Sequence, residues 1–252
     1  MEKTFLNRPN PLLTVMLQCK TPEVAISRIR NANCLGADAY GLQVETLQPG
    51  FQNPETFKKL FAEMQGRPCY VTNYRYASNQ KLTDDDLAKG LITLAESGGT
   101  LCDVMGDLFC KHPEELTDNE EAIQKQIELI SKLHDMGAEV LMSSHLYKFA
   151  PAERVLEIAF EQKRRGADII KIVTAADTME QQIENLRITN LLKQELGAPF
   201  LFLSGGVSTI HRRLGMKLGC AMALCVYEHD ALSTASQPLL SIMKTIRDSI
   251  DF

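Results

Sequence analysis

The sequence lacks several features that would place it in a specialised class of protein. Its 252 residues include no tryptophan, no C-x-x-C pair and no H-x-x-x-H or H-E-x-x-H motif. Without such ligand spacings we expect no metal and no cofactor. The seven cysteines are odd in number and several lie in apolar runs, which indicates free thiols in a reducing cytoplasm rather than a disulfide framework.

The sequence also lacks a large excess of either charge and has no long hydrophobic run. Lysine and arginine total 27 against 32 acidic residues, a net charge of −5. A nucleic-acid partner, which requires a basic face, is therefore not expected. No apolar stretch reaches the roughly 18 residues of a membrane span, and the N-terminal sequence MEKTFLNRPNP lacks the apolar core of a signal peptide. We expect a cytoplasmic protein that binds a small molecule and no membrane.

Apolar runs and helix-like patterns alternate along the chain. Most of the apolar runs are continuous, which is typical of parallel strands buried on both faces. The predicted strands are 12–20, 37–45, 68–75, 101–108, 138–147, 167–174, 200–206 and 221–228. Four of them follow a Gly-Ala dipeptide in which glycine is expected to end a helix, namely at Gly36, Gly137, Gly166 and Gly197.

Helix start signals occupy the segments between these runs. Thr21 and Asn53 each precede a proline and an acidic residue, an arrangement that predicts an N-cap followed by the first helical turn. Thr83 precedes three aspartates that favour the positive end of a helix dipole. Thr117 and Glu120 have the spacing of a capping box. These signals predict helices between successive strands.

Such alternation without a linker predicts one α/β domain over residues 1–252, a (β/α)8 TIM barrel. The length agrees, because these barrels run to about 250 residues. A doubly wound open sheet is the rival architecture. It usually carries a glycine-rich turn after its first strand, whereas the sequence QCKTP at positions 18–22 has none.

Lys171 carries the clearest chemical implication. It lies between Ile170 and Ile172, so strand alternation directs the isoleucines toward the helices and the lysine into the barrel. Burial disfavours the ammonium form, and a neutral amine attacks ketones to form a Schiff base. The alternative is a lysine that reaches solvent or pairs with an acid.

Other polar residues stand where barrel enzymes place their active sites, at the C-terminal ends of strands. His145 ends the fifth run and can exchange a proton near neutral pH, or it simply makes a hydrogen bond at the strand edge. Arg75 ends the third run, where the alternative is a surface ion pair. Arg212 follows two glycines in the loop 204–213, which suits a carboxylate or a phosphate.

In strand order, these residues resemble the type I 3-dehydroquinate dehydratase family. The shared features are a lysine on the sixth strand, Ser-Ser-His on the fifth, an arginine ending the third and an arginine loop after the seventh. Ser233 and Gln237 add the family's Ser…Gln lid after the eighth strand. The resemblance covers nearly the whole chain.

The resemblance implies a lyase without cofactors, in which 3-dehydroquinate loses water to give 3-dehydroshikimate on the route to aromatic amino acids. Lys171 would form an imine with the ring ketone, and His145 would move the protons. Arg212 would hold the substrate carboxylate beneath the Ser233 and Gln237 lid, and Arg75 would bind nearby. It also implies a homodimer.

The sequence departs from that family at three positions. Gly41 and Gln43 stand where the second strand usually has a glutamate and an arginine, and Asn79 replaces an acid that supports the histidine. Glu45 or Asp107 is a candidate to compensate. Two other functions therefore stay open. One is a Schiff-base aldolase or lyase for another keto acid or a phosphorylated ketose, favoured by the glycines after the seventh strand. The other is an inactive barrel that binds a metabolite or partner.

Overall fold

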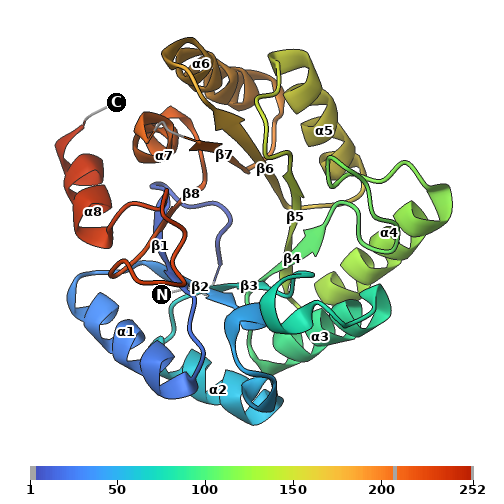
Figure 1. Ribbon diagram of the computed structural model, residues 1–252, viewed down its shortest axis with the longest axis vertical. Coiled ribbons are helices and arrows are strands. Elements are labelled where there is room, and N and C mark those ends of the chain that lie inside the picture. Colours follow the sequence, from blue (N-terminus) through green and yellow to red (C-terminus); the bar gives the residue numbers. More distant parts are fainter. Residues whose placement is uncertain (1–3, 207–208, 251–252) are drawn as a thin grey trace.

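The computed structural model describes residues 4–206 and 209–250, which form a ring of parallel strands surrounded by helices (Figure 1). The strands are β1 (Leu12–Leu17), β2 (Ala39–Gln43), β3 (Cys69–Thr72), β4 (Leu101–Met105), β5 (Glu139–His145), β6 (Ile169–Ala176), β7 (Phe200–Gly206) and β8 (Met222–Cys225). They are hydrogen-bonded in the order β7-β6-β5-β4-β3-β2-β1-β8. The Ala221 N–H donates to the Phe200 carbonyl at 2.8 Å and brings the two ends of the sheet together. The predicted (β/α)8 barrel is confirmed, and the open sheet is excluded.

Helices cover the outside of this ring. They are α1 (Pro22–Cys34), α2 (Pro54–Glu63), α3 (Asp84–Ser97), α4 (Glu120–Asp135), α5 (Ala152–Arg164), α6 (Met179–Glu195), α7 (Ile210–Leu214) and α8 (Leu240–Ser249). Short 3₁₀ turns lie at η1 (Val44–Thr46), η2 (Pro49–Phe51), η3 (Ala77–Asn79) and η4 (Gly215–Leu218). Every predicted strand run contains a strand, and β6 extends two residues beyond the predicted end at 174.

Most of the predicted helix starts are confirmed. Asn53 caps α2 by accepting the Thr56 N–H at 3.0 Å, and Thr83 forms a capping box on α3. The capping box predicted at Thr117 is wrong. α4 begins at Glu120 with Asn119 as its N-cap, because the Asn119 side chain accepts the Ala122 N–H at 2.9 Å.

The predicted helix-ending glycines share one backbone conformation. Their φ angles are 82° at Gly36, 80° at Gly137, 99° at Gly166 and 59° at Gly197. Side chains with a Cβ rarely adopt this left-handed region, which is why glycine recurs where a helix turns back into a strand. Four of the barrel's helix-to-strand connections are thus encoded locally.

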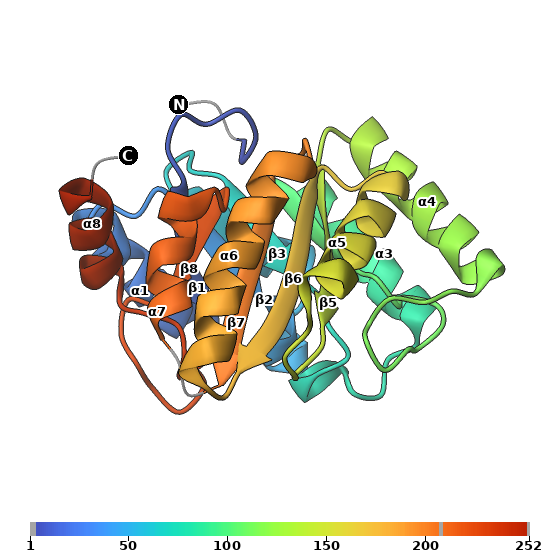
Figure 2. The same cartoon turned by 90° about the horizontal axis from the view of Figure 1, so that it is seen from above.

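The N-terminal segment covers the end of the barrel opposite the mouth that the C-terminal ends of the strands form (Figure 2). Phe5 is 2% exposed and packs into the core, and its N–H donates to the Glu139 carboxylate at the start of β5 (2.8 Å). At the mouth, the segment between β8 and α8 is held by Gln18, whose amide nitrogen donates to Thr234 Oγ1 at 3.0 Å. One end of the barrel is therefore closed, and the other is framed by loops.

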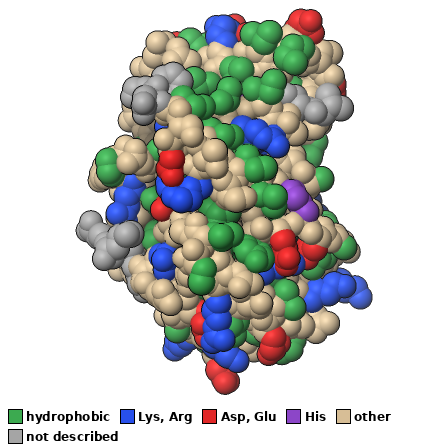
Figure 3. Space-filling model, turned by 90° about the vertical axis from the view of Figure 1, so that its left-hand side faces the viewer, with side chains coloured by type: hydrophobic (Ala, Val, Ile, Leu, Met, Phe, Trp, Pro, Cys, Tyr) green, Lys and Arg blue, Asp and Glu red, His purple; other side chains and the backbone are tan. Residues whose placement is uncertain are grey.

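The surface gives no sign of a single-sign charge field on the face drawn in Figure 3, where basic and acidic side chains are interspersed with apolar ones. Within the ranges 4–206 and 209–250, none of the helices is both long and apolar enough to cross a membrane.

Candidate active site

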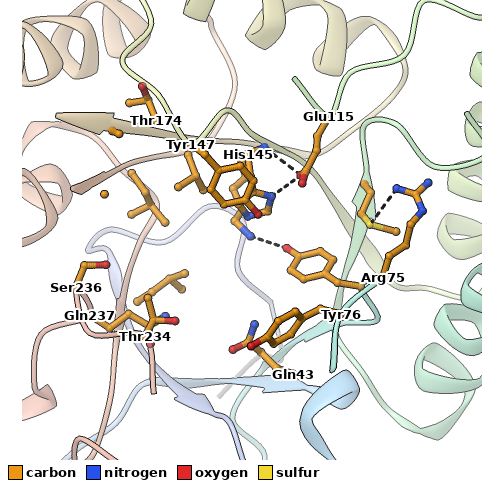
Figure 4. A pocket seen from close by; sticks show the side chains of 18 of the residues that line it. Gln43, Arg75, Tyr76, Glu115, His145, Tyr147, Thr174, Thr234, Ser236 and Gln237 are labelled. Carbon is orange, nitrogen blue, oxygen red and sulfur yellow. Dashed lines mark hydrogen bonds and ion pairs between the residues drawn. The ribbon is translucent and has the colours of Figure 1, made fainter. Parts of the chain in front are cut away.

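A cavity of about 780 Å³ opens at the C-terminal ends of the strands. Five of the predicted site residues line it together, although they come from widely separated parts of the chain: Arg75, His145, Lys171, Arg212 and Gln237. Figure 4 shows His145 joined to Glu115 on one side of this space, and Thr234, Ser236 and Gln237 on another. The barrel fold thus collects one polar cluster from β5, β6 and the segments after β3, β7 and β8.

Ser233 is the exception among the predicted site residues. Its hydroxyl donates to the Asp230 carbonyl at 2.9 Å and accepts the Asp230 N–H at 2.8 Å, which closes a tight turn. Ser233 is not among the residues that line the cavity, whereas Thr234 and Ser236 are. The role of Ser233 in a lid stays a prediction, and Ser236 is the serine that borders the cavity.

Lys171 points into the barrel interior and is 4% exposed, as its place on the strand predicts. Its Nζ donates to the phenol oxygens of Tyr70 at 2.8 Å and Tyr74 at 2.6 Å, and lies 3.2 Å from Asp103 Oδ2. The expectation of an amine free of acids is therefore wrong. The acid partner lies inside the barrel, because Asp103 on β4 faces the same interior, and the lysine still borders the cavity.

Asp103 is the centre of this buried cluster. It is 1% exposed, both phenols donate to its Oδ2, and Ser143 donates to its Oδ1 at 2.6 Å. Burial, followed by the nearby Asp103 carboxylate, raises the pKa of Tyr70 and of Tyr74 well above the usual value. Both phenols therefore keep their protons and serve as donors.

His145 is oriented by a carboxylate that the sequence had not singled out. Its Nδ1 lies 2.6 Å from Glu115 Oε2, and the same oxygen accepts the His145 backbone N–H at 3.1 Å. A carboxylate at Nδ1 fixes the tautomer and leaves Nε2 as the basic nitrogen. The Tyr74 ring packs edge-on against the imidazole, with centroids 5.5 Å apart. His145 is thus held in one orientation at the cavity wall.

The loop after β4 presents Glu115 through buried hydrogen bonds. Glu115 has a φ of 48°, a left-handed conformation that costs a non-glycine residue roughly 1–2 kcal/mol. Its carbonyl accepts the Ser144 hydroxyl at 2.8 Å. Arg165, 2% exposed, donates to the carbonyls of Gly106 at 3.0 Å and Thr117 at 2.6 Å. These bonds compensate the local strain and hold the carboxylate toward the histidine.

The two arginines at the mouth are in different states. Arg75 is held by the carboxylates of Asp84 (2.6 and 2.7 Å) and Asp107 (2.7 Å), so its charge is neutralised within the protein. Arg212 makes one bond among the described residues, from Nε to the Ser204 carbonyl at 2.8 Å. Burial lowers the pKa of Arg212 to about 10, which leaves it cationic at neutral pH. Val207 and Ser208, part of the predicted anion loop, lie outside the described residues.

β2 and the η1 turn that follows it place two polar side chains, Gln43 and Glu45, at the cavity. Glu45 is fully buried, accepts the Thr72 hydroxyl at 3.0 Å, and has its pKa raised to about 7 by burial. Gln43 donates to Glu45 at 3.3 Å, while its own amide oxygen has no partner in the described part of the chain. At Gly41 a Cβ would lie 2.2 Å from Met16 Sδ, so Met16 occupies the space that a longer side chain would need.

Asn79 makes no hydrogen bond to His145 among the described residues. It is 1% exposed and donates to the Asn73 side chain at 2.7 Å. Support for His145 therefore comes from Glu115 on a different loop. Sequence reasoning missed Glu115, for which the loop sequence offers no periodic signal. It could have found Tyr70 and Asp103, because the alternation that directs Lys171 inward applies to them as well.

In the described ranges, no group of three or more His, Cys, Asp or Glu side chains is placed to hold a metal ion. The arrangement instead combines a buried amine, a histidine–carboxylate pair and one cationic arginine. Such a set suits covalent catalysis on a carbonyl compound that carries an anionic group.

Comparison with known proteins points in the same direction. The model of the family "Type I 3-dehydroquinase" matches residues 13–250. A curated 3-dehydroquinate dehydratase from Geobacillus thermodenitrificans (strain NG80-2) is 29% identical over 97 residues, which span 38% of this chain and 38% of that relative's length.

Solved structures of enzymes with that name share the fold. The 3-dehydroquinate dehydratase from Geobacillus kaustophilus HTA426 superposes with a TM-score of 0.81 at 16% identity, covering 95% of this chain and 91% of that one. The type I enzyme from Clostridium difficile, solved with covalently modified comenic acid, gives 0.79 at 18% identity, with 96% and 95% covered. At these identities the superpositions show the fold alone.

Proposed function

This chain belongs to the type I 3-dehydroquinase family, and on that premise we propose that it is a Schiff-base dehydratase that converts 3-dehydroquinate into 3-dehydroshikimate. The family is one of hydro-lyases. The observation that carries the proposal is the buried amine of Lys171 in the wall of a cavity that also contains His145 and its partner Glu115. An imine-forming lysine and a proton-transferring histidine are the two groups that this elimination requires.

The reaction begins with attack of the Lys171 amine on the ring ketone, which releases water and leaves an iminium. The iminium withdraws electrons from the neighbouring carbon, so that His145 Nε2 can remove a proton there. Glu115 stabilises the imidazolium that forms. His145 then returns the proton to the departing hydroxyl, which leaves as water. Hydrolysis of the conjugated iminium releases the enone product and restores Lys171.

Substrate binding falls to residues with unused hydrogen-bonding capacity. Arg212 would hold the carboxylate, because its charge is not paired with an acid among the residues described. Gln43 and Gln237 line the cavity, and the buried amide oxygen of each has no partner in the ranges 4–206 and 209–250. With the amide turned toward the cavity, each would accept a hydrogen bond from a ring hydroxyl. Ser236 completes the lid beside Gln237.

One observation favours a second candidate, a Schiff-base lyase for another keto acid or a phosphorylated ketose. Arg75 is engaged by two carboxylates, and Gly41 leaves a methionine rather than a polar group facing the interior. A site with fewer charged contacts for hydroxyls would accept a less hydroxylated substrate. Lys171 and His145 would serve that reaction in the same roles.

The proposal also includes a cytoplasmic location. The seven cysteines are all free thiols, which supports a reducing cytoplasm. The substrate and product place the reaction on the shikimate route to aromatic amino acids. A homodimer is proposed from the family alone.

A borohydride trap tests the proposal. The protein is incubated with 3-dehydroquinate and borohydride, and the modified peptide is identified by mass while enone absorbance is followed without reductant. We expect an adduct at Lys171 that Lys171→Ala abolishes. Lys111→Ala is the matched control, because Lys111 lines the same cavity, and it should leave trapping intact. Absence of both adduct and enone would refute the dehydratase. Adducts with a phosphorylated ketose instead would support the second candidate.

A further inference from the structure

We propose that Tyr74 is a catalytic acid–base residue that carries protons between the Lys171 amine and the oxygen of the bound carbonyl compound, with Asp103 holding the proton between steps. The inference rests on the proposed Schiff-base chemistry at Lys171. It adds a proton path for imine formation that is separate from the path through His145.

The geometry of the buried cluster carries the proposal. The phenol oxygen of Tyr74 accepts a hydrogen bond from Lys171 Nζ at 2.6 Å and donates its own proton to Asp103 Oδ2. The residue also lines the cavity, so one phenol touches the reacting nitrogen, a proton store and the substrate space. A group that transfers protons must lie within hydrogen-bond reach of the atoms it serves, and Tyr74 is hydrogen-bonded to both Lys171 and Asp103.

In the free protein, each N–H of the Lys171 ammonium group has an acceptor. Its three ammonium protons match three acceptors, the phenol oxygens of Tyr70 and Tyr74 and the carboxylate of Asp103. The proton that must leave before the amine can attack therefore passes to one of these groups. No hydrogen bond joins His145 to the Lys171 amine in the part of the chain that the structure describes.

The proton balance closes within this cluster. Lys171 gives one proton to Asp103, and the neutral amine forms a C–N bond with the carbonyl carbon. The carbonyl oxygen takes the Tyr74 proton while the new N–C ammonium returns one to the phenolate, which gives a neutral carbinolamine. Asp103 then passes its proton through Tyr74 to the carbinolamine hydroxyl, the C–O bond breaks, and water leaves. The iminium cation remains beside the Asp103 carboxylate, as the ammonium did.

Comparison with Tyr70 distinguishes a tyrosine that transfers protons from one that only holds Lys171 in place. Tyr70 makes the same bonds to Lys171 and Asp103 as Tyr74 does and also borders the cavity, but it is 0% exposed, whereas Tyr74 is only half-buried. If the phenols only hold the lysine in place, loss of either hydroxyl should have the same effect. If one delivers protons to the ligand, loss of the Tyr74 hydroxyl should matter far more.

The experiment compares Tyr74→Phe with Tyr70→Phe in the full-length protein. The probe is 4-nitrobenzaldehyde, which has no acidic proton of its own, and the rate of imine formation at Lys171 is read by borohydride trapping and peptide mass. We expect Tyr74→Phe to lower the maximal trapping rate by about 10²-fold, with little change in the half-saturating aldehyde concentration. Tyr70→Phe should retain most of the rate. Added small acids such as acetic acid should restore part of the rate in Tyr74→Phe alone.

The possible results distinguish the proton relay through Tyr74 from the proposed dehydratase activity. Equal rates in wild type and Tyr74→Phe, or equal losses in both variants without rescue by acid, would overturn the relay. Trapping of the aldehyde with the expected loss in Tyr74→Phe, but no turnover of 3-dehydroquinate, would support the relay and refute the dehydratase. No aldehyde adduct at Lys171 in the wild type would overturn the relay, while trapping with 3-dehydroquinate decides the dehydratase separately.

Discussion

The Glu115 carboxylate and the His145 imidazole form a hydrogen bond of 2.6 Å, although the two residues lie 30 positions apart. His145 ends β5, while Glu115 comes from the loop after β4. The bond forms because neighbouring parallel strands bring their C-terminal ends to the same edge of the barrel. It sets the tautomer of the histidine and supplies the negative charge that an imidazolium needs.

Glu115→Gln should therefore lower kcat for 3-dehydroquinate by at least about 10²-fold, with a smaller change in KM, because the amide neither stabilises an imidazolium nor enforces the tautomer. Steady-state kinetics measure both constants. Glu114→Gln is the matched control, because Glu114 lies next to Glu115 on the same loop but pairs with Lys148 and Arg154 instead. Equal losses in the two variants would show that Glu115 acts only through the loop.

The Lys171–Asp103 pair should show strong energetic coupling. Lys171→Met leaves a buried carboxylate without its cation, and Asp103→Asn leaves a buried ammonium without its anion, so each should cost about 3–5 kcal/mol in the free energy of unfolding. The double variant removes both charges and should cost clearly less than the sum. Denaturant titration of the four proteins gives the coupling energy. Additive costs would contradict an interaction between the two groups.

Arg165→Lys should weaken the loop that carries Glu115. A lysine cannot reproduce the fork by which Arg165 reaches Gly106 and Thr117 at once. We expect a loss of about 2–4 kcal/mol in unfolding free energy, together with a fall in kcat. Arg164→Lys is the control, because the exposed Arg164 pairs only with Glu161 among the described residues. A stable Arg165→Lys variant with full activity would contradict the role of this network.

Glu45 should make the protein less stable at higher pH. Burial raises its pKa from 4.5 to about 7, so between these values the folded protein holds a proton that the unfolded chain releases. The free energy of unfolding therefore falls as pH rises through this window and levels off above it. Glu45→Gln should remove the loss and gain up to about 3 kcal/mol over wild type at high pH.

Denaturant unfolding at a pH below 4.5 and at one above 7 measures this difference. Gln43 can turn its unpartnered amide oxygen toward the new glutamine, so the introduced N–H group has an acceptor. Glu195→Gln, at an exposed position, should show no comparable pH dependence. A wild type whose stability is flat across the window would contradict the argument.

The inward direction of Lys171 could be predicted because strand alternation is a local property. The same argument applied to Tyr70 and Asp103 would have placed both beside it. Their meeting is less local, since β3, β4 and β6 converge on one interior only after the barrel has closed. The isolated amine that sequence reasoning favoured for Lys171 was therefore wrong, whereas its burial was right.

Loop residues were harder to foresee. Glu115, Ser233 and Arg75 have no periodic pattern, and their partners depend on how each loop folds back over the mouth. Arg75 lines the cavity, and what could not be predicted is its pairing with Asp84 and Asp107, which reach it from α3 and the β4 loop. Which carboxylate pairs with which basic side chain is visible only in the folded chain.

The sequence by itself determined the eightfold strand–helix order, the helix-ending glycines and the identity of the groups at the strand ends, because each depends on short-range periodicity and backbone conformation. The tertiary structure alone decided the pairing of those groups: Glu115 with His145, and Asp103 and the two tyrosines with Lys171. Hydrogen bonds and ion pairs act over a few ångströms, so chain positions far apart in sequence interact only once the barrel has brought them together.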